Sequence, residues 1–192
     1  MPNLPQEYFR AYQPAFDGAA AVHGGGFQLK LMDETTILRG DGSWPWTAWV
    51  EGDDILVRGI ATAFGGDDDS EDDGSTASGV NTKGNPGLLG CALPMRDDAL
   101  HALRGSPIPR MPFGLHPDGV PNPEGAHVVV IFNGGVTQGP FPVIDLGPAK
   151  STGHVLDLTV AAARLWDLHA TADNFEARVT YRILGGAKYI QL

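Results

Sequence analysis

Two short apolar runs in the C-terminal third of the sequence each contain an aspartate. The stretch 143–166 is VIDLGPAKSTGHVLDLTVAAARLW, in which large aliphatic residues flank both Asp145 and Asp157. Carboxylates seldom lie inside such runs unless another group pairs with them. Apolar runs this short, separated by a Gly-Pro loop, predict buried strands. We therefore expect two short buried strands, each with a carboxylate that another group must pair with.

The rest of the sequence also predicts mostly short strands. The 192 residues include 26 Gly and 15 Pro, and 42% of the chain is hydrophobic, which favours one turn-rich domain with a real core. We expect short helices over 97–105 and 159–168, the second one capped by Thr159. An arm is expected over 1–26, and strands are expected at 27–32, in two runs within 47–64, and at 88–95, 126–133, 140–147, 154–158 and 177–184.

Composition excludes several classes of protein. The net charge of −10 argues against a nucleic-acid partner and against an anionic membrane partner. The single cysteine, Cys91, rules out an internal disulfide framework and a multi-cysteine zinc site, and its apolar setting predicts a buried residue. No apolar run approaches the ~20 residues that span a bilayer. The first residues show no secretory signal, so the sequence assigns no compartment.

The order of predicted elements resembles the six-stranded double-psi β-barrel. The segment IDLGPAKSTGHVLDLTVAAA is similar to the DRGP…G…IDLS…AA segment of rare lipoprotein A proteins. It is also similar to the DTGG…G…IDL segment of the three-aspartate domain in lytic transglycosylase A, and HVLD resembles the HFD motif of expansins and family-45 endoglucanases. Weaker matches are IATAFGG, DDGSTASG and MPFG, and together the resemblance covers roughly residues 55–192.

This resemblance implies chemistry on glycans. In these families a carboxyl group in a surface groove protonates the leaving glycosidic oxygen. Such a general acid needs a raised pKa, which aliphatic neighbours and a second acid provide. Asp157 matches the HFD or IDL aspartate and Asp145 the DRGP or DTGG aspartate, so both are candidate catalytic residues. The alternative is that each carboxylate only binds backbone N–H groups in a turn.

Two positions depart from the family patterns. Where family-45 enzymes have TRYWD, this chain has TAFGG, with Phe64 in place of tyrosine and Gly66 in place of the acid. Asp67, one residue later, is the candidate for that second acid. Gly90 stands where rare lipoprotein A proteins have a histidine. A lytic transglycosylase, which in that family needs essentially one acid, requires fewer of these groups.

Other residues are candidates for substrate binding. Trp44 and Trp46 offer ring faces on which sugars stack, although packing of the N-terminal arm would explain them equally well. His154, three residues before Asp157, is a candidate for lining the groove, although strand alternation alone need not put both on one face. Phe64, which stands in place of the motif tyrosine, is a further candidate. The acidic run 67–74 fails as a calcium-binding EF-hand loop because Val80 occupies the twelfth position. We expect a solvated loop there and predict neither a metal nor a cofactor.

We thus predict a mainly β protein with short helices, in which residues 1–52 form an N-terminal β-rich extension and residues 53–192 a double-psi β-barrel. The predicted function is a glycan-cleaving enzyme, a lytic transglycosylase or glycoside hydrolase acting on peptidoglycan or another β-linked polysaccharide. The alternative is a non-catalytic, expansin-like module that binds carbohydrate or cell wall. A glycan substrate would place the protein outside the cell or in the periplasm. The sequence leaves the oligomeric state open.

Overall fold

A computed structural model describes residues 36–67, 69 and 72–190, which belong to one compact unit. The arm expected over 1–26 and the strand expected at 27–32 lie outside the described residues. Within the described part, no helix has the length and apolar character needed to cross a membrane. The elements are β1 (Ile37–Leu38), β2 (Ala48–Glu51), β3 (Asp54–Phe64), β4 (Cys91–Leu93), β5 (His127–Phe132), β6 (Thr137–Leu146), η2 (Lys150–Thr152), β7 (Leu156–Thr159), α2 (Val160–Ala163), β8 (Glu176–Ile183) and η3 (Gly186–Tyr189).

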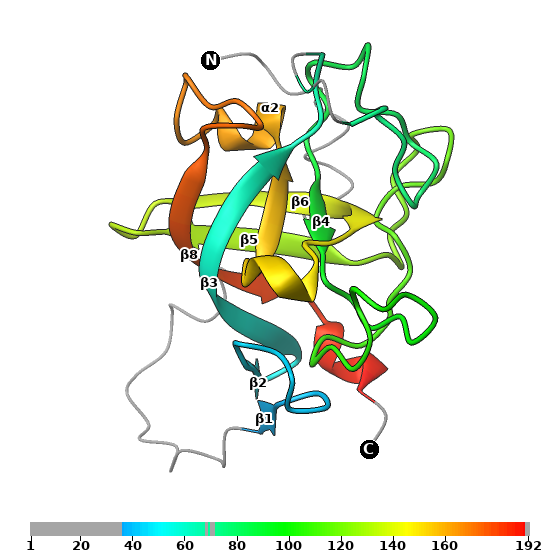
Figure 1. Ribbon diagram of the computed structural model, residues 1–192, viewed down its shortest axis with the longest axis vertical. Coiled ribbons are helices and arrows are strands. Elements are labelled where there is room, and N and C mark those ends of the chain that lie inside the picture. Colours follow the sequence, from blue (N-terminus) through cyan, green and yellow to red (C-terminus); the bar gives the residue numbers. More distant parts are fainter. Residues whose placement is uncertain (1–35, 68, 70–71, 191–192) are drawn as a thin grey trace. The chain divides into compact units, whose positions relative to one another are not determined.

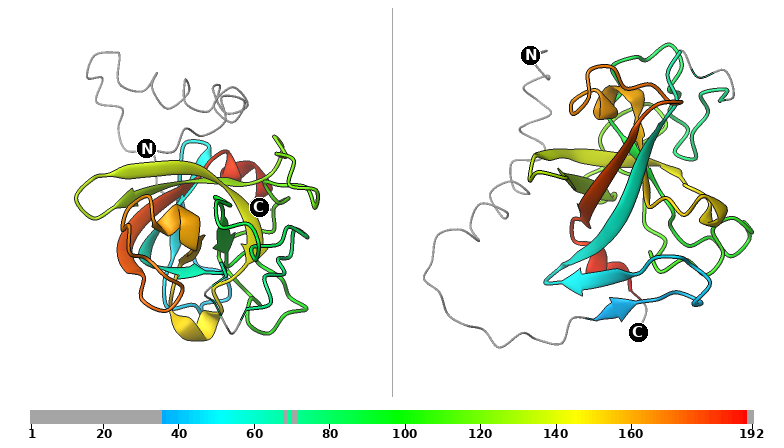
Figure 2. Two further views of the ribbon diagram at one scale, coloured as in Figure 1. Left: turned by 90° about the horizontal axis from the view of Figure 1, so that it is seen from above. Right: turned by 60° about the vertical axis from the view of Figure 1, so that its left-hand side comes forward.

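Six strands close into a mixed β-barrel (Figure 1). The order around the barrel is β3-β7-β4-β6-β5-β8, and β8 returns to pair with β3. The pairs β3–β7 and β4–β6 are parallel, and the other four pairs are antiparallel. The right-hand view of Figure 2 shows the long strand β3 beside β8, the pair that completes the closure. Closure leaves these six strands no open edge, and the short strands β1 and β2 continue the sheet beyond one end of β3.

The barrel interior is the hydrophobic core. Along a β-strand, successive side chains point to opposite faces of the sheet, here the barrel interior and the outside. On β8, Val179, Tyr181 and Ile183 are at most 3% exposed, which confirms the alternation expected for this segment. The other strands supply the rest of this core, chiefly Ile55, Val57, Ala61, Cys91, Leu93, Val128, Val130, Phe132, Phe141, Val143, Leu156 and Leu158.

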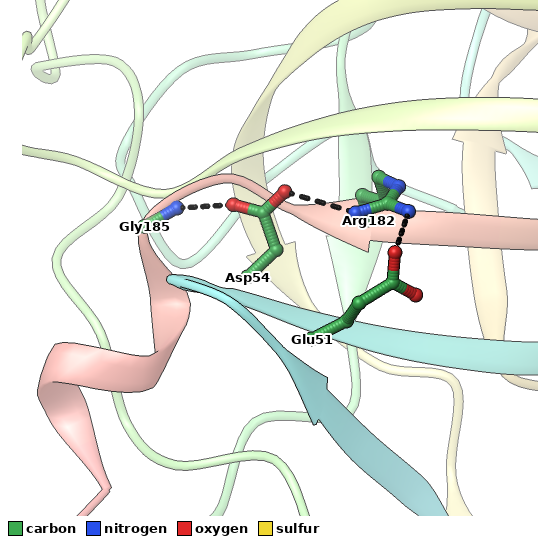
Figure 3. A network of polar contacts seen from close by, with 4 residues as sticks. All are labelled: Glu51, Asp54, Arg182 and Gly185. Atoms are coloured by element: carbon green, nitrogen blue, oxygen red, sulfur yellow. Dashed lines mark hydrogen bonds and ion pairs between the residues drawn. The ribbon is translucent and has the colours of Figure 1, made fainter. Parts of the chain in front are cut away.

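A small ionic network ties the β2–β3 turn to the end of β8 (Figure 3). Arg182 contacts Glu51 at 2.7 Å and Asp54 at 3.4 Å, and the other oxygen of Asp54 accepts a hydrogen bond from the Gly185 amide at 2.9 Å. The groups are partly exposed, so the network adds little free energy. It fixes where the chain leaves the barrel.

Neither of the two expected helices forms over its full predicted length. Residues 97–105 form turns, because Arg104 Nε bonds to the Asp98 carbonyl and the Gly105 amide bonds to the Asp98 carboxylate, which folds the segment on itself. The helix expected over 159–168 is only four residues long. After Ala163 the chain turns, and the Trp166 ring stacks on Phe132 with centroids 4.8 Å apart. Isolated short helices are marginal, so local contacts decide their form.

Candidate functional site

The barrel register places the two aspartates in one row across neighbouring strands. On β7, Asp157 pairs with Thr62 of β3 on one side and with Ala92 of β4 on the other. Ala92 in turn pairs with Asp145 of β6. Directly paired residues point to the same face of a sheet, and here that face is the outer one, because the residues on either side of Thr62, Ala92 and Asp157 belong to the core. The Cα atoms of the two aspartates are thus two strand spacings apart, about 10 Å.

Asp157 is largely enclosed but keeps one oxygen open. Its Oδ1 accepts a hydrogen bond from the Thr62 hydroxyl. Its Oδ2 makes no hydrogen bond with the described residues and is not fully buried, and a Cβ added at Gly147 would lie 3.8 Å from it. Burial raises the pKa of the Asp157 carboxyl, while the Thr62 hydrogen bond and the positive charge of His154 act in the opposite direction. The result is a carboxyl group that holds its proton more strongly than usual.

Asp145 is anchored by the backbone. Its Oδ1 accepts hydrogen bonds from the Ala77 amide and from the Leu146 amide, both at 2.8 Å. The first of these bonds holds the loop after β3 against β6. Burial also raises the pKa of Asp145, and the two amide hydrogen bonds oppose that rise. Asp145 therefore combines a structural contact with a negative charge near Asp157.

Neighbouring negative charges further raise the pKa values of both Asp157 and Asp145. The negative charge of Asp145 contributes to the raised pKa of Asp157, and the charge of Asp72 contributes to that of Asp145. Asp72 belongs to the acidic loop, where its Oδ1 accepts a hydrogen bond from the Gly74 amide at 2.8 Å. The loop thus adds a third carboxylate to the electrostatics of the row.

Three of the other predicted residues lie at or beside this row. His154 acts on Asp157 by charge, and its carbonyl accepts a hydrogen bond from Trp46 Nε1 at 3.2 Å. Trp46 is partly buried against the core, so it holds the His154 backbone in place. Phe64 packs on a small outer cluster that includes Ile144, the neighbour of Asp145 in sequence.

The two remaining predicted residues lie elsewhere. Asp67 follows the end of β3, accepts a hydrogen bond from the Gly84 amide at 2.8 Å and lines a cavity of about 150 Å³ together with Arg164 and Thr82. Trp44 is 7% exposed and donates from Nε1 to the Arg104 carbonyl at 3.1 Å. Its buried position indicates a packing role and leaves no open ring face for a sugar.

Sequence reasoning missed Thr62, Asp72 and the Ala77 amide. Thr62 lies in IATAF, the stretch that resembles the opening strand of the barrel families, so its place opposite Asp157 would follow from knowing that these two strands pair in parallel. Asp72 and Ala77 belong to the loop that composition marks only as acidic and glycine-rich. Nothing local in the sequence indicates that this loop bonds to β6.

The described part of the chain contains no group of three or more His, Cys, Asp or Glu side chains arranged to hold a metal ion. No protein-family model and no curated protein matches this sequence. The site must therefore be interpreted from its own chemistry: two partly buried carboxyl groups with raised pKa values, a hydroxyl, and an imidazole nearby.

Proposed function

We propose that this protein is a glycan-cleaving enzyme of the double-psi β-barrel type, with Asp157 as its general acid. The observation that carries the proposal is the row formed by Thr62, Asp157, Ala92 and Asp145, in which both carboxyl groups have raised pKa values. Glycosidic bond cleavage needs a protonated acid beside a group that meets positive charge, and this row offers both.

The strand pairings support the double-psi topology. Replacing each barrel strand by the one three places later exchanges β3 with β6, β4 with β7 and β5 with β8. This exchange turns the parallel pair β3–β7 into the parallel pair β6–β4, and the antiparallel pair β3–β8 into the antiparallel pair β6–β5. The remaining pairs, β4–β7 and β5–β8, map onto themselves. Two parallel pairs related in this way are what a six-stranded double-psi barrel requires.

The two aspartates differ in a way that favours Asp157 as the acid. Asp145 is held by two backbone amides, which stabilise its charged form. Asp157 has one hydroxyl partner and an oxygen left open beside Gly147. In the proposed step Asp157 donates its proton to the glycosidic oxygen as the bond from the sugar C1 breaks. The Asp145 carboxylate then stabilises the positive charge that develops on the ring.

The second half of the reaction decides between hydrolysis and lytic cleavage. Either water or the C6 hydroxyl of the same sugar attacks C1, and its proton passes to the Asp157 carboxylate, which restores the acid. Asp67, the candidate second acid, lines a cavity to which neither Asp145 nor Asp157 contributes. The proposal therefore favours a reaction that uses one proton-transferring group, and lytic cleavage by the C6 hydroxyl is the simpler of the two.

The test is to incubate the protein with peptidoglycan and with β-glucans and to measure the release of reducing ends and of anhydro-sugar ends. We expect Asp157→Asn to lower turnover by about 10²–10⁴-fold, because the amide keeps the shape of the side chain but has no acidic proton to transfer to the glycosidic oxygen. Asp145→Asn should have a smaller effect. The matched control is Asp53→Asn, an exposed change in the β2–β3 turn, which should leave turnover unchanged.

Two results would contradict the proposal. If the wild-type protein binds one of these glycans but releases no ends, the protein is a carbohydrate-binding module and not an enzyme. If Asp157→Asn cleaves as fast as the control, Asp157 is not the acid. Circular dichroism of each variant separates a lost proton donor from a lost fold.

A further inference from the structure

A cleft lies apart from the aspartate row and is lined by residues of β1 and η3. The strand β1 is at the lower end of the barrel in Figure 1. It has a volume of about 470 Å³, which is the size of a small-molecule site. Four segments line it: residues 37–40, 96–98, 106–110 and 189–190. Neither catalytic candidate on β6 or β7 contributes to this cleft.

The cleft is rich in positive charge. Arg39, Arg96 and Arg110 line it, and Asp98 is the one acidic residue among its lining residues. The Asp98 carboxylate already accepts a hydrogen bond from the Gly105 amide at 3.2 Å. Three of the chain's 13 basic residues thus gather in one hollow of a protein whose net charge is −10. Such a concentration is unexpected on an acidic surface and favours an anionic ligand.

Two of the three guanidinium groups, those of Arg96 and Arg110, are held in place, and none of the three is neutralised by another described residue. Arg96 donates from Nε to the Ser106 carbonyl at 3.1 Å, which leaves its two terminal nitrogens available. Arg110 lies over the Phe113 ring, with 4.8 Å from Cζ to the ring centroid. Among the residues that the structure describes, none of the three arginines forms an ion pair. Held but uncompensated guanidinium groups are suited to bind carboxylate or phosphate oxygens.

The backbone behind the arginines is rigid. Met95 pairs with Ile108 in a parallel bridge, the Arg96 amide donates to the Ile108 carbonyl at 2.8 Å, and both Met95 and Ile108 are fully buried. The segments before Arg96 and before Arg110 are therefore fixed against each other by the core. A site built in this way loses little conformational entropy when a ligand binds.

The cleft is also lined by apolar residues. Ile37, Leu38, Pro107, Pro109 and Ile190 line it, together with Tyr189, whose hydroxyl donates to the Glu124 carbonyl at 3.0 Å. With its hydroxyl engaged, Tyr189 offers the cleft mainly its ring. The Lys188 ammonium lies 5.0 Å from the centroid of that ring and adds a fourth positive charge nearby. The ligand should therefore combine an oxyanion with an apolar body.

We propose that this cleft, which we call the arginine cleft, is a binding site for a small organic anion with a carboxylate or phosphate group attached to an apolar moiety. Arg96 and Arg110 hold the oxyanion, Arg39 adds a further positive charge, and the apolar lining residues with Tyr189 pack against the apolar moiety. The site is independent of glycan cleavage and would stand if that activity were absent.

Titration calorimetry of the full chain with 1-naphthyl phosphate and with 1-naphthoate tests the proposal, with 1-naphthalenemethanol as the neutral probe. We expect one of the two anions to bind with a dissociation constant of about 1 mM or below and the alcohol to bind at least about tenfold more weakly. The tighter of the two anions identifies which oxyanion the site prefers. Arg96→Gln and Arg110→Gln should each weaken anion binding by about tenfold or more.

The matched control is Arg178→Gln, which removes an exposed arginine of β8 outside the cleft and should leave the dissociation constant unchanged. If Arg96→Gln lowers the melting temperature, Arg39→Gln replaces it, because the Arg39 side chain makes no hydrogen bond or ion pair with the described residues. The proposal is wrong if neither anion binds, if the alcohol binds as tightly as the anions, or if the cleft variants behave like Arg178→Gln.

Discussion

Asp145 and Asp157 have similar neighbours in the sequence but different surroundings in the barrel. Each is followed by leucine, and each lies on the outer face of a strand. The amides of Ala77 and Leu146 hold the first carboxylate, whereas a hydroxyl and a nearby imidazole are the partners of the second. At the scale of single residues, the same side chain becomes an anchor in one place and a candidate acid in the other.

The raised pKa of Asp157 predicts how stability depends on pH. The folded protein binds a proton more tightly than the unfolded chain, whose carboxyl keeps a pKa near 3.8. The free energy of unfolding should therefore fall as the pH rises from about 3.8 through the raised native pKa, and it should stay lower at neutral pH. Asp157→Asn removes the buried charge, so we expect it to raise the melting temperature at pH 7 and to lose this advantage below pH 3.8.

Calorimetric melting curves of wild type and variant between pH 3 and pH 8 check this prediction. Asp53→Asn, an exposed change of the same chemistry, should shift the melting temperature little at any pH. A lower melting temperature for Asp157→Asn at pH 7 would show that the charged carboxylate stabilises the fold. It would contradict the destabilisation that we expect from a partly buried catalytic acid.

At the scale of elements, one side chain connects β7 and α2 with the segment before β4. Thr159 ends β7, and its hydroxyl accepts hydrogen bonds from the Ala162 amide at 3.3 Å and from the Gly90 amide at 3.2 Å. It also donates to the Leu88 carbonyl at 2.6 Å. The N-cap expected from the sequence is confirmed. The hydrogen bonds from Thr159 to the segment before β4 are long-range, so local sequence patterns do not predict them. The short helix α2 is thus fixed by the barrel more than by its own length.

We expect Thr159→Val to lower the free energy of unfolding by about 2 kcal/mol, because the methyl group fills the same space but leaves two amides and one carbonyl unpaired. Urea denaturation measures the change. Thr180→Val is the matched control. Its hydroxyl accepts one hydrogen bond, from the exposed Arg58 side chain, so this variant should change stability by less than about 0.5 kcal/mol. Equal effects of the two substitutions would mean that Thr159 only fills space.

At the scale of the whole molecule, the barrel depends on close packing between β3 and the entry to β7. Gly59 lies in the middle of β3, and a Cβ added there would meet Val155 Cγ1 at 2.5 Å. The Val155 amide donates to the Ile60 carbonyl at 2.9 Å, and its carbonyl accepts a hydrogen bond from the buried Tyr181 hydroxyl, also at 2.9 Å. A clash here is transmitted to β3, β7 and β8 together.

Gly59→Ala should therefore lower the free energy of unfolding by about 1–3 kcal/mol through overpacking. Combining it with Val155→Ala should cost less than the sum of the two single changes, because the shortened side chain leaves room for the new methyl group. A double-mutant cycle in urea measures this coupling. Gly87→Ala, at a loop position with nothing within 4 Å of an added Cβ, is the control and should be close to neutral. Strict additivity would contradict the proposed contact.

Local sequence patterns locate most of the barrel strands and, on β8, the side chains that face the core. Alternation on 177–184, the apolar run at 126–133 and the turn between the two strands of 47–64 all correspond to elements of the structure, because these patterns act over a few neighbouring residues. The burial of Cys91 followed in the same way from its apolar neighbours. The strand expected at 27–32 lies outside the described residues and stays a prediction.

The neighbours of each strand, and the register between them, follow from the tertiary structure and not from local sequence patterns. The parallel pairings put Thr62 next to Asp157 and Ala92 next to Asp145, and they separate Asp67 from both aspartates, although Thr62 and Asp67 are five residues apart in sequence. The arginine cleft likewise collects residues 39, 96 and 110 from segments that show no common motif. Such contacts depend on the register between distant strands, which the closure of the barrel fixes and which local periodicity does not encode.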